Sequence, residues 1–299
     1  MTITATIARR KSEKNAIILA HNYQPPEIQD LADLCGDSLE LSIKAAETDA
    51  DVIVFCGVHF MAETASILCP EKTVLLPAKE AGCPMADMIT PESLAAKKKE
   101  LGELPVVTYV NSSAAVKAVS TVCCTSANSI KIVESLDAPE LLMTPDKNLA
   151  AYTAAHTSKT IHRWNGCCPI HDALRAGDVH RAKKRFPEAA VMVHPECRPE
   201  VTALADAVLS TSGMLRYAQS SPRESFLVGT ENGLLYPLQK ACPDKSFHPV
   251  SEKMICADMK RIQPEAVAIC LADLQPEVRV PEEIRRAAQQ AVQRMLEAS

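Results

Sequence analysis

The chain has 299 residues, of which 47% are hydrophobic and 23% are charged, and its formal net charge is −5. These values are typical of a globular protein with two or three small domains, and the scattered Lys and Arg residues form no basic region, so we expect no nucleic-acid partner. No apolar run approaches the roughly 20 residues that span a bilayer, and the start lacks the apolar stretch of a signal peptide. We therefore expect no membrane contact and a cytoplasmic location.

The predicted elements alternate between strand and helix along the whole chain. Short apolar runs predict strands at 16–20, 52–55, 73–76, 106–108, 141–143, 160–162, 191–193, 226–229 and 246–248. Apolar residues at helical spacing predict helices between them, for example over 60–68, 148–155 and 232–241, and an amphipathic helix in the tail from 281 to 299. Buried strands separated by helices favour parallel sheets with helices on both faces.

The same pattern occurs three times, which divides the chain into similar units. His21, Tyr109 and His194 each follow an apolar run and stand 88 and 85 positions apart. Ser38, Ser126 and Thr211 repeat these intervals, and Cys83, Cys168 and Cys256 stand 85 and 88 positions apart. A repeated period indicates one supersecondary unit used several times. We predict three α/β/α units at 1–88, 89–175 and 176–270 around a pseudo-threefold axis, followed by a helical tail at 271–299 packed on the body.

Twelve cysteines in a chain of this kind favour a metal or cluster site over disulfides. Cys35, Cys56, Cys69 and Cys270 lie in apolar or helical stretches typical of core packing. Cys83, Cys168 and Cys256 lie instead in loops, and a threefold arrangement would bring them together. The pattern leaves open whether Cys167 or Cys168 is the second ligand, and no Cys-x-x-Cys pair supports a zinc ribbon. Three thiolates would leave one iron of a cubane cluster open, able to act as a Lewis acid.

Polar residues at the carboxyl ends of the predicted strands provide the other half of a site. Ser38, Ser126 and Thr211 each precede a helical pattern, so we expect them to cap helices whose free N–H groups bind carboxylate or phosphate. The side chains able to transfer protons or orient such a substrate are those of His21, Tyr23, Tyr109, Asn111, His194 and Glu196.

Several long motifs resemble those of the quinolinate synthase family. They are AHNYQPPEIQDLADLCGDSLELS, FCGVHFMAETASIL, TYVNSSAAVKA, HPECRPEV, STSGMLRYA and VGTENGLLYPL, and together the resemblance covers nearly the whole chain. It implies three α/β/α domains around a central, oxygen-sensitive [4Fe-4S] cluster held by one Cys from each domain. It also implies a condensing enzyme and dehydratase of NAD biosynthesis, which joins iminoaspartate to dihydroxyacetone phosphate and releases phosphate and water.

The resemblance also assigns residues by motif. Cys83, Cys168 and Cys256 would hold the cluster, with the fourth iron open to substrate or water. The substrate-binding residues would be His21, Ser38, Tyr109, Val110, Asn111, Ser126, His194, Pro195, Glu196 and Thr211. The catalytic residues would be Tyr23, Glu196, His21, Tyr109 and His194, with Tyr23 and Glu196 as the foremost proton carriers and His171 as a weaker candidate. Lys253 stands where some members have a redox-responsive Cys-x-x-Cys, so we expect no such regulation.

Two rival functions share parts of this pattern. A cluster-dependent hydro-lyase would have the open iron and the anion pocket but would not consume dihydroxyacetone phosphate. An iron–sulfur sensor or carrier would have a partner-binding surface instead of an enclosed polar pocket. For the synthase we further expect a transient contact with the oxidase that makes iminoaspartate, and closure of a domain or of a loop near Tyr23 over the ligand.

Overall fold

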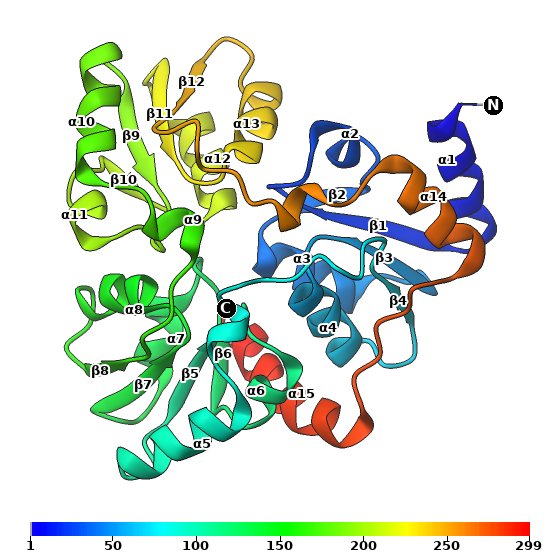
Figure 1. The fold of residues 1–299 in the computed structure, drawn as a ribbon, viewed down its shortest axis with the longest axis horizontal. Coiled ribbons are helices and arrows are strands. Elements are labelled where there is room, and N and C mark those ends of the chain that lie inside the picture. The colour runs from blue at the N-terminus through cyan, green and yellow to red at the C-terminus, as the bar shows by residue number, and fades with distance from the viewer. Residues whose placement is uncertain (1) are drawn as a thin grey trace.

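The computed structural model describes residues 2–299, and this part of the chain forms three lobes that each contain a four-stranded sheet (Figure 1). All strands are parallel, and each sheet has the same order: the second strand of the unit lies at one edge, followed by the first, the third and the fourth. The prediction of an α/β protein built from three similar units is therefore confirmed.

The elements follow one another in nearly the same sequence in each unit. The first unit contains α1 (Ile3–Glu13), β1 (Ala16–His21), α2 (Pro26–Gln29), β2 (Leu34–Gly36), α3 (Ser38–Glu47), β3 (Val52–Cys56), α4 (His59–Leu68), β4 (Thr73–Leu75) and η1 (Ala86–Met88). The second contains α5 (Pro91–Glu100), β5 (Val106–Tyr109), α6 (Ala114–Ala118), β6 (Val122–Cys124), α7 (Ser129–Ser135), β7 (Glu140–Thr144), α8 (Lys147–Ala154), β8 (Thr160–Arg163) and α9 (Pro169–Asp172). The third contains α10 (Ala176–Arg185), β9 (Ala190–Val193), α11 (Pro199–Thr202), β10 (Ala207–Val208), α12 (Thr211–Ser220), β11 (Ser225–Gly229), η2 (Asn232–Leu234), α13 (Leu235–Ala241), β12 (Ser246–Pro249) and η3 (Asp258–Lys260).

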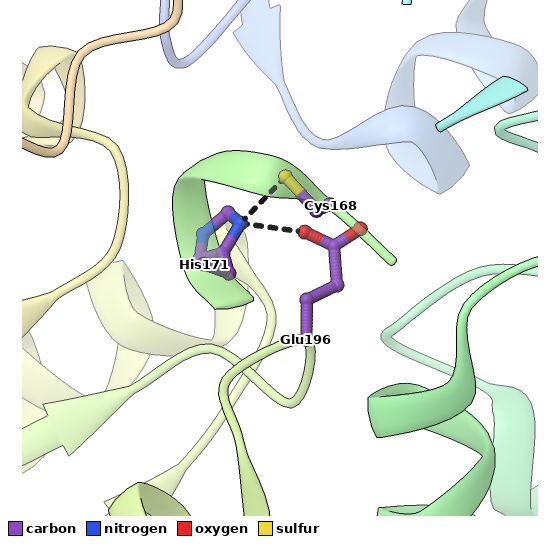
Figure 2. Close-up of side chains that lie close together, drawn as sticks. All are labelled: Cys168, His171 and Glu196. Atoms are coloured by element: carbon purple, nitrogen blue, oxygen red, sulfur yellow. Dashed lines mark hydrogen bonds and ion pairs between the residues drawn. The ribbon is translucent and has the colours of Figure 1, made fainter. Parts of the chain in front are cut away.

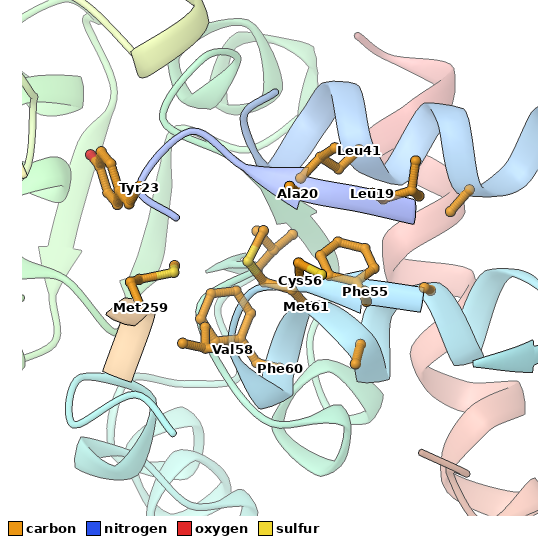
Figure 3. Packing of buried hydrophobic residues seen from close by; sticks show 14 of the residues in the cluster. Leu19, Ala20, Tyr23, Leu41, Phe55, Cys56, Val58, Phe60, Met61 and Met259 are labelled. Carbon is orange, nitrogen blue, oxygen red and sulfur yellow. The ribbon is translucent and has the colours of Figure 1, made fainter. Parts of the chain in front are cut away.

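The core of each unit lies between its sheet and the covering helices. In the first unit every residue of β3 is buried, because helices cover both faces of the sheet. Leu19 of β1 and Phe55 of β3 pack beside Leu41 of α3 and Met61 of α4 (Figure 3). Burying a side chain of this size stabilises the fold by about 1.5–3 kcal/mol.

Two C-terminal helices connect the lobes. Helix α14 (Pro264–Asp273) packs against α1 and β3 of the first unit, although it begins within the segment that the sequence assigns to the third. Helix α15 (Glu282–Glu297) packs against α4, α6 and β6, so it joins the first unit to the second. The helix predicted in the tail is therefore present, whereas the unit boundaries at 88, 175 and 270 stay predictions.

The strand order determines where a ligand site can form. The connection reverses direction between the first and third strands of each sheet, and such switch points form crevices at the carboxyl ends of the strands. His21 ends β1, Tyr109 ends β5, and His194 directly follows β9, so all three lie at these ends. Among the helices of residues 2–299, none combines the length and the apolar character needed to cross a membrane.

Candidate active site

Two adjoining cavities lie where the three units meet. The smaller one, which we call the polar cavity, has a volume of about 40 Å³ and is lined by His21, Tyr23, Asp37, Ser38, Phe60, Met61, Tyr109, Asn111, Ser126, His194, Glu196, Thr211 and Met259. The larger one, the thiol cavity, has a volume of about 250 Å³, and its lining includes Cys83, Cys168, Cys256 and His171. Tyr23, Phe60, Asn111, Glu196 and Met259 line both cavities, so the two are parts of one site.

The structure brings together nearly all the residues singled out in the sequence. Each unit contributes a cysteine to the thiol cavity and strand-end residues to the polar cavity. Cys168 lines the thiol cavity, and Cys167 is not among its lining residues. Val110 and Pro195 are buried but line neither cavity.

The surroundings of the three thiols fit a metal cluster. Each sulfur accepts a hydrogen bond from the backbone N–H of the residue three positions further on. Burial raises the pKa of all three thiols, to about 12 for Cys83, while these N–H groups act in the opposite direction. A bound cation deprotonates its thiol ligands, so the N–H groups would then stabilise thiolate sulfurs in a buried cavity.

Glu196 is held between two histidines beside Cys168. Its Oε2 lies 2.7 Å from His171 Nδ1, which also lies 3.2 Å from the Cys168 sulfur (Figure 2). The same Oε2 lies 3.3 Å from His194 Nδ1. Burial alone would raise the pKa of Glu196, but His194 and His171 outweigh it and hold that pKa well below its usual range. Glu196 is therefore a carboxylate in a nearly solvent-free setting.

A hydroxyl chain leads from this carboxylate to Tyr23. Thr230 Oγ1 lies 2.8 Å from His171 Nε2 and 2.6 Å from the Tyr23 hydroxyl. Burial, with the charge of Glu196, raises the pKa of Tyr23 well above its ordinary value, and the same causes act on Tyr109. Both phenols are therefore protonated near neutral pH.

His21 is positioned as a hydrogen-bond donor to the polar cavity. Its Nδ1 accepts the backbone N–H of Tyr23 at 3.1 Å, which places the proton of the neutral ring on Nε2. Burial, together with the charge of His194, lowers the pKa of His21 to about 3. His194 repeats the contact, since its Nδ1 accepts the backbone N–H of Glu196 at 3.3 Å.

The predicted capping roles of Ser38, Ser126 and Thr211 are wrong. Asp37 caps α3 and Ser210 caps α12, so Ser38 and Thr211 are the first helical residues. Ser126 precedes the α7 N-cap by two positions. The physical reason is that a cap needs an extended backbone just before the helix, which Asp37 and Ser210 adopt. The three hydroxyls nevertheless line the polar cavity beside the helix starts.

Two buried acceptors in the site lack a partner. Within residues 2–299, neither Glu196 Oε1 nor Asn111 Oδ1 receives a hydrogen bond. Leaving a buried acceptor unsatisfied costs about 1–3 kcal/mol, which a ligand carrying N–H or O–H donors would recover.

Sequence reasoning missed two polar groups of the site. Asp37 lines the polar cavity, and the capping box that it forms with Glu40 is visible in the letters DSLE. Thr230 directly follows β11, but only the folded chain places its hydroxyl between Tyr23 and His171.

Comparisons with known proteins identify the family of this chain. The family model described as "Quinolinate synthetase A protein" matches residues 5–297. A quinolinate synthase of Geotalea uraniireducens is 55% identical over 284 residues, covering 95% of this chain and 93% of the relative. One of Dehalococcoides mccartyi is 55% identical over 297 residues, covering 99% and 98%, and one of Methanoregula boonei is 53% identical over 290 residues, covering 97% and 96%. The chain therefore belongs to the quinolinate synthase family.

Proposed function

We propose that this protein is a quinolinate synthase that condenses iminoaspartate with dihydroxyacetone phosphate, releasing phosphate and water, in NAD biosynthesis. The observation that carries the proposal is the pair of adjoining cavities, with one cysteine from each unit on one side and proton-carrying side chains on the other. An iron–sulfur sensor or carrier would not need an enclosed polar cavity beside its cluster.

Cys83, Cys168 and Cys256 would hold an iron–sulfur cluster in the thiol cavity. With three protein thiolates, a [4Fe-4S] cluster keeps one iron without a protein ligand, and that iron supplies Lewis acidity toward a substrate oxygen. Substrate binding and proton transfer would depend on the protein's own residues.

The polar cavity suits the charges of the two substrates. The first turns of α3 and α12, at Ser38 and Thr211, present N–H groups that favour carboxylate and phosphate oxygens. His21 would donate from Nε2 to a substrate oxygen, and Asn111 Oδ1 would accept from a substrate N–H or O–H group. His194 and Ser126, whose Nε2 and Oγ atoms are 3.1 Å apart, would fix the opposite wall.

Glu196 would act as the general base and then return its proton. It is ionised and borders both cavities. No group of the described residues donates to its Oε1, so this oxygen can accept a substrate proton. Tyr23 and Tyr109, whose hydroxyls stay protonated, would donate to leaving oxygens. The hydrogen bonds of Thr230 to Tyr23 and His171 would hold both side chains in place beside Glu196.

The size of the polar cavity supports opening and closing during turnover. A volume of about 40 Å³ holds a few water molecules at most, so substrates need more room. Beside this cavity, side-chain hydrogen bonds join the first unit to the third, such as Asn22 Nδ2 to Thr211 Oγ1 at 3.0 Å and Ser210 Oγ to Asp37 Oδ2 at 3.0 Å. Polar contacts of this kind can separate without exposing a large apolar surface. Closure, the oxidase contact and the cytoplasmic location stay predictions.

The test is turnover by anaerobically reconstituted protein. Iminoaspartate generated in place by an aspartate oxidase is mixed with dihydroxyacetone phosphate, and quinolinate and phosphate are measured together. We expect equal amounts of both products and a change in the cluster spectrum on adding a quinolinate analogue. Iron-loaded protein that leaves dihydroxyacetone phosphate unconsumed would refute the proposal and favour a hydro-lyase.

A further inference from the structure

The residue two positions beyond the third strand of each unit belongs to the internal repeat. These residues are Val58, Asp146 and Glu231, and they stand 88 and 85 positions apart, as His21, Tyr109 and His194 do. In the second and third units this position holds a carboxylate that is only 1% exposed. In the first unit it holds an apolar side chain, so the repeat is chemically unequal here.

All three units share a backbone contact next to this position. The N–H of the following residue donates to the carbonyl oxygen two residues before the cavity cysteine. The three contacts are His59 to Ala81, Lys147 to Gly166 and Asn232 to Met254, each at 2.8 Å. Gly166 allows the close approach in the second unit, because a Cβ there would lie 2.5 Å from the Pro145 carbonyl oxygen. The backbone therefore holds each cysteine loop beside the end of the third strand.

The two carboxylates add a second contact that the first unit lacks. Asp146 accepts the Cys168 N–H through Oδ2 at 2.9 Å and the Leu149 N–H through Oδ1 at 2.6 Å. Glu231 accepts the Cys256 N–H through Oε1 at 3.1 Å and the Gly233 N–H through Oε2 at 2.7 Å. Each carboxylate thus uses one oxygen for a helix start and the other for a cysteine loop.

We propose that Asp146 and Glu231 are positioning residues for the cluster, each fixing the loop of one cysteine ligand to the strand end of its unit. The proposal rests on the proposed function, because it assumes that Cys168 and Cys256 bind the cluster. Partners that orient metal ligands without touching the metal typically change metal affinity about 10- to 100-fold when they are replaced. The Cys83 loop, opposite Val58, would depend on its backbone contact alone.

Asp146→Asn is the cleaner variant, because Glu231 also pairs with Lys260 at 2.9 Å. An amide has a single oxygen, so it cannot accept both N–H groups and turns an NH₂ toward one of them. Asp37→Asn is the control for altering a buried helix cap: Oδ1 of Asp37 accepts two N–H groups, Oδ2 accepts the Ser210 hydroxyl, and neither oxygen contacts a cysteine loop. Because Asp37 lines the polar cavity, the comparison uses iron release and not turnover. Full-length proteins are reconstituted with iron and sulfide without oxygen, and iron release to a ferrous chelator is followed by absorbance.

We expect Asp146→Asn to release iron at least about tenfold faster than the wild type, and Asp37→Asn to release it at the wild-type rate. Equal release by all three proteins, or equal acceleration in both variants, would overturn the positioning role. A wild-type protein that takes up no iron would instead remove the cofactor assignment on which the proposal rests.

A second measurement needs no variant and so does not depend on how well one folds. In the cluster-free wild type, hydrogen exchange of the Cys168 and Cys256 amides should be at least about tenfold slower than that of the Cys83 amide, because only the first two donate to a buried carboxylate. Exchange at the Cys83 amide that is as slow as at the other two would refute the proposed asymmetry.

Discussion

His21 should make the folded protein sensitive to mild acid. The imidazole is 6% exposed, and burial, helped by the charge of His194, lowers its pKa from 6.5 to about 3. Because the unfolded chain binds the proton more readily, stability from the neutral ring is complete above pH 6.5 and falls as the pH drops toward 3. At pH 5, which lies 1.5 units below the pKa of the ring in the unfolded chain, the free energy of unfolding is lower by about 2 kcal/mol, at about 1.4 kcal/mol per unit.

The matched variant is His21→Asn, whose side-chain oxygen can still accept the Tyr23 N–H but does not titrate. Urea unfolding of cluster-free protein, followed by far-ultraviolet circular dichroism at pH 7 and pH 5, gives the free energy of unfolding. We expect the wild type to lose about 2 kcal/mol more than the variant between these pH values. His180→Asn, at an exposed histidine, should behave as the wild type does. Equal losses in wild type and His21→Asn would show that the buried ring is not held neutral.

Three further predictions concern the site. Glu196→Gln should lower kcat by about 10²–10⁴-fold while the iron content stays unchanged, and a kcat within twofold of the wild type would exclude Glu196 as the base. Cys168→Ser should lose most of its iron under anaerobic reconstitution and Cys167→Ser should keep it, since only Cys168 faces the thiol cavity; the reverse result would move the ligand by one position. Thr230→Val should lower kcat about tenfold with KM unchanged, and Thr230→Ser should restore it, because the lost hydroxyl positions Tyr23. A valine variant with raised KM alone would contradict that role.

Hydrophobic periodicity and the internal repeat of the sequence by themselves determined the fold class and which residues gather at the site. Runs such as 52–55 predict buried strands of a parallel sheet, and the helical spacing within 281–299 predicts an amphipathic helix, and the structure contains both. Since equivalent positions of a repeat occupy equivalent places, the intervals of 88 and 85 were enough to bring three cysteines and three strand-end residues to one centre.

Only the tertiary structure decided how individual side chains point. Adjacent residues such as Cys167 and Cys168 differ in direction because of backbone dihedral angles, which the order of letters does not reveal, so the sequence alone left the ligand open. For the same reason, two helix caps lie one residue before the predicted position and the third lies two residues after it. Thr230 forms a hydrogen bond with Tyr23, which lies 207 positions earlier in the chain. Helix α14 follows the third unit in sequence but packs against the first. Such contacts depend on how separate units dock, and docking is governed by the shape of assembled surfaces, which no local pattern contains.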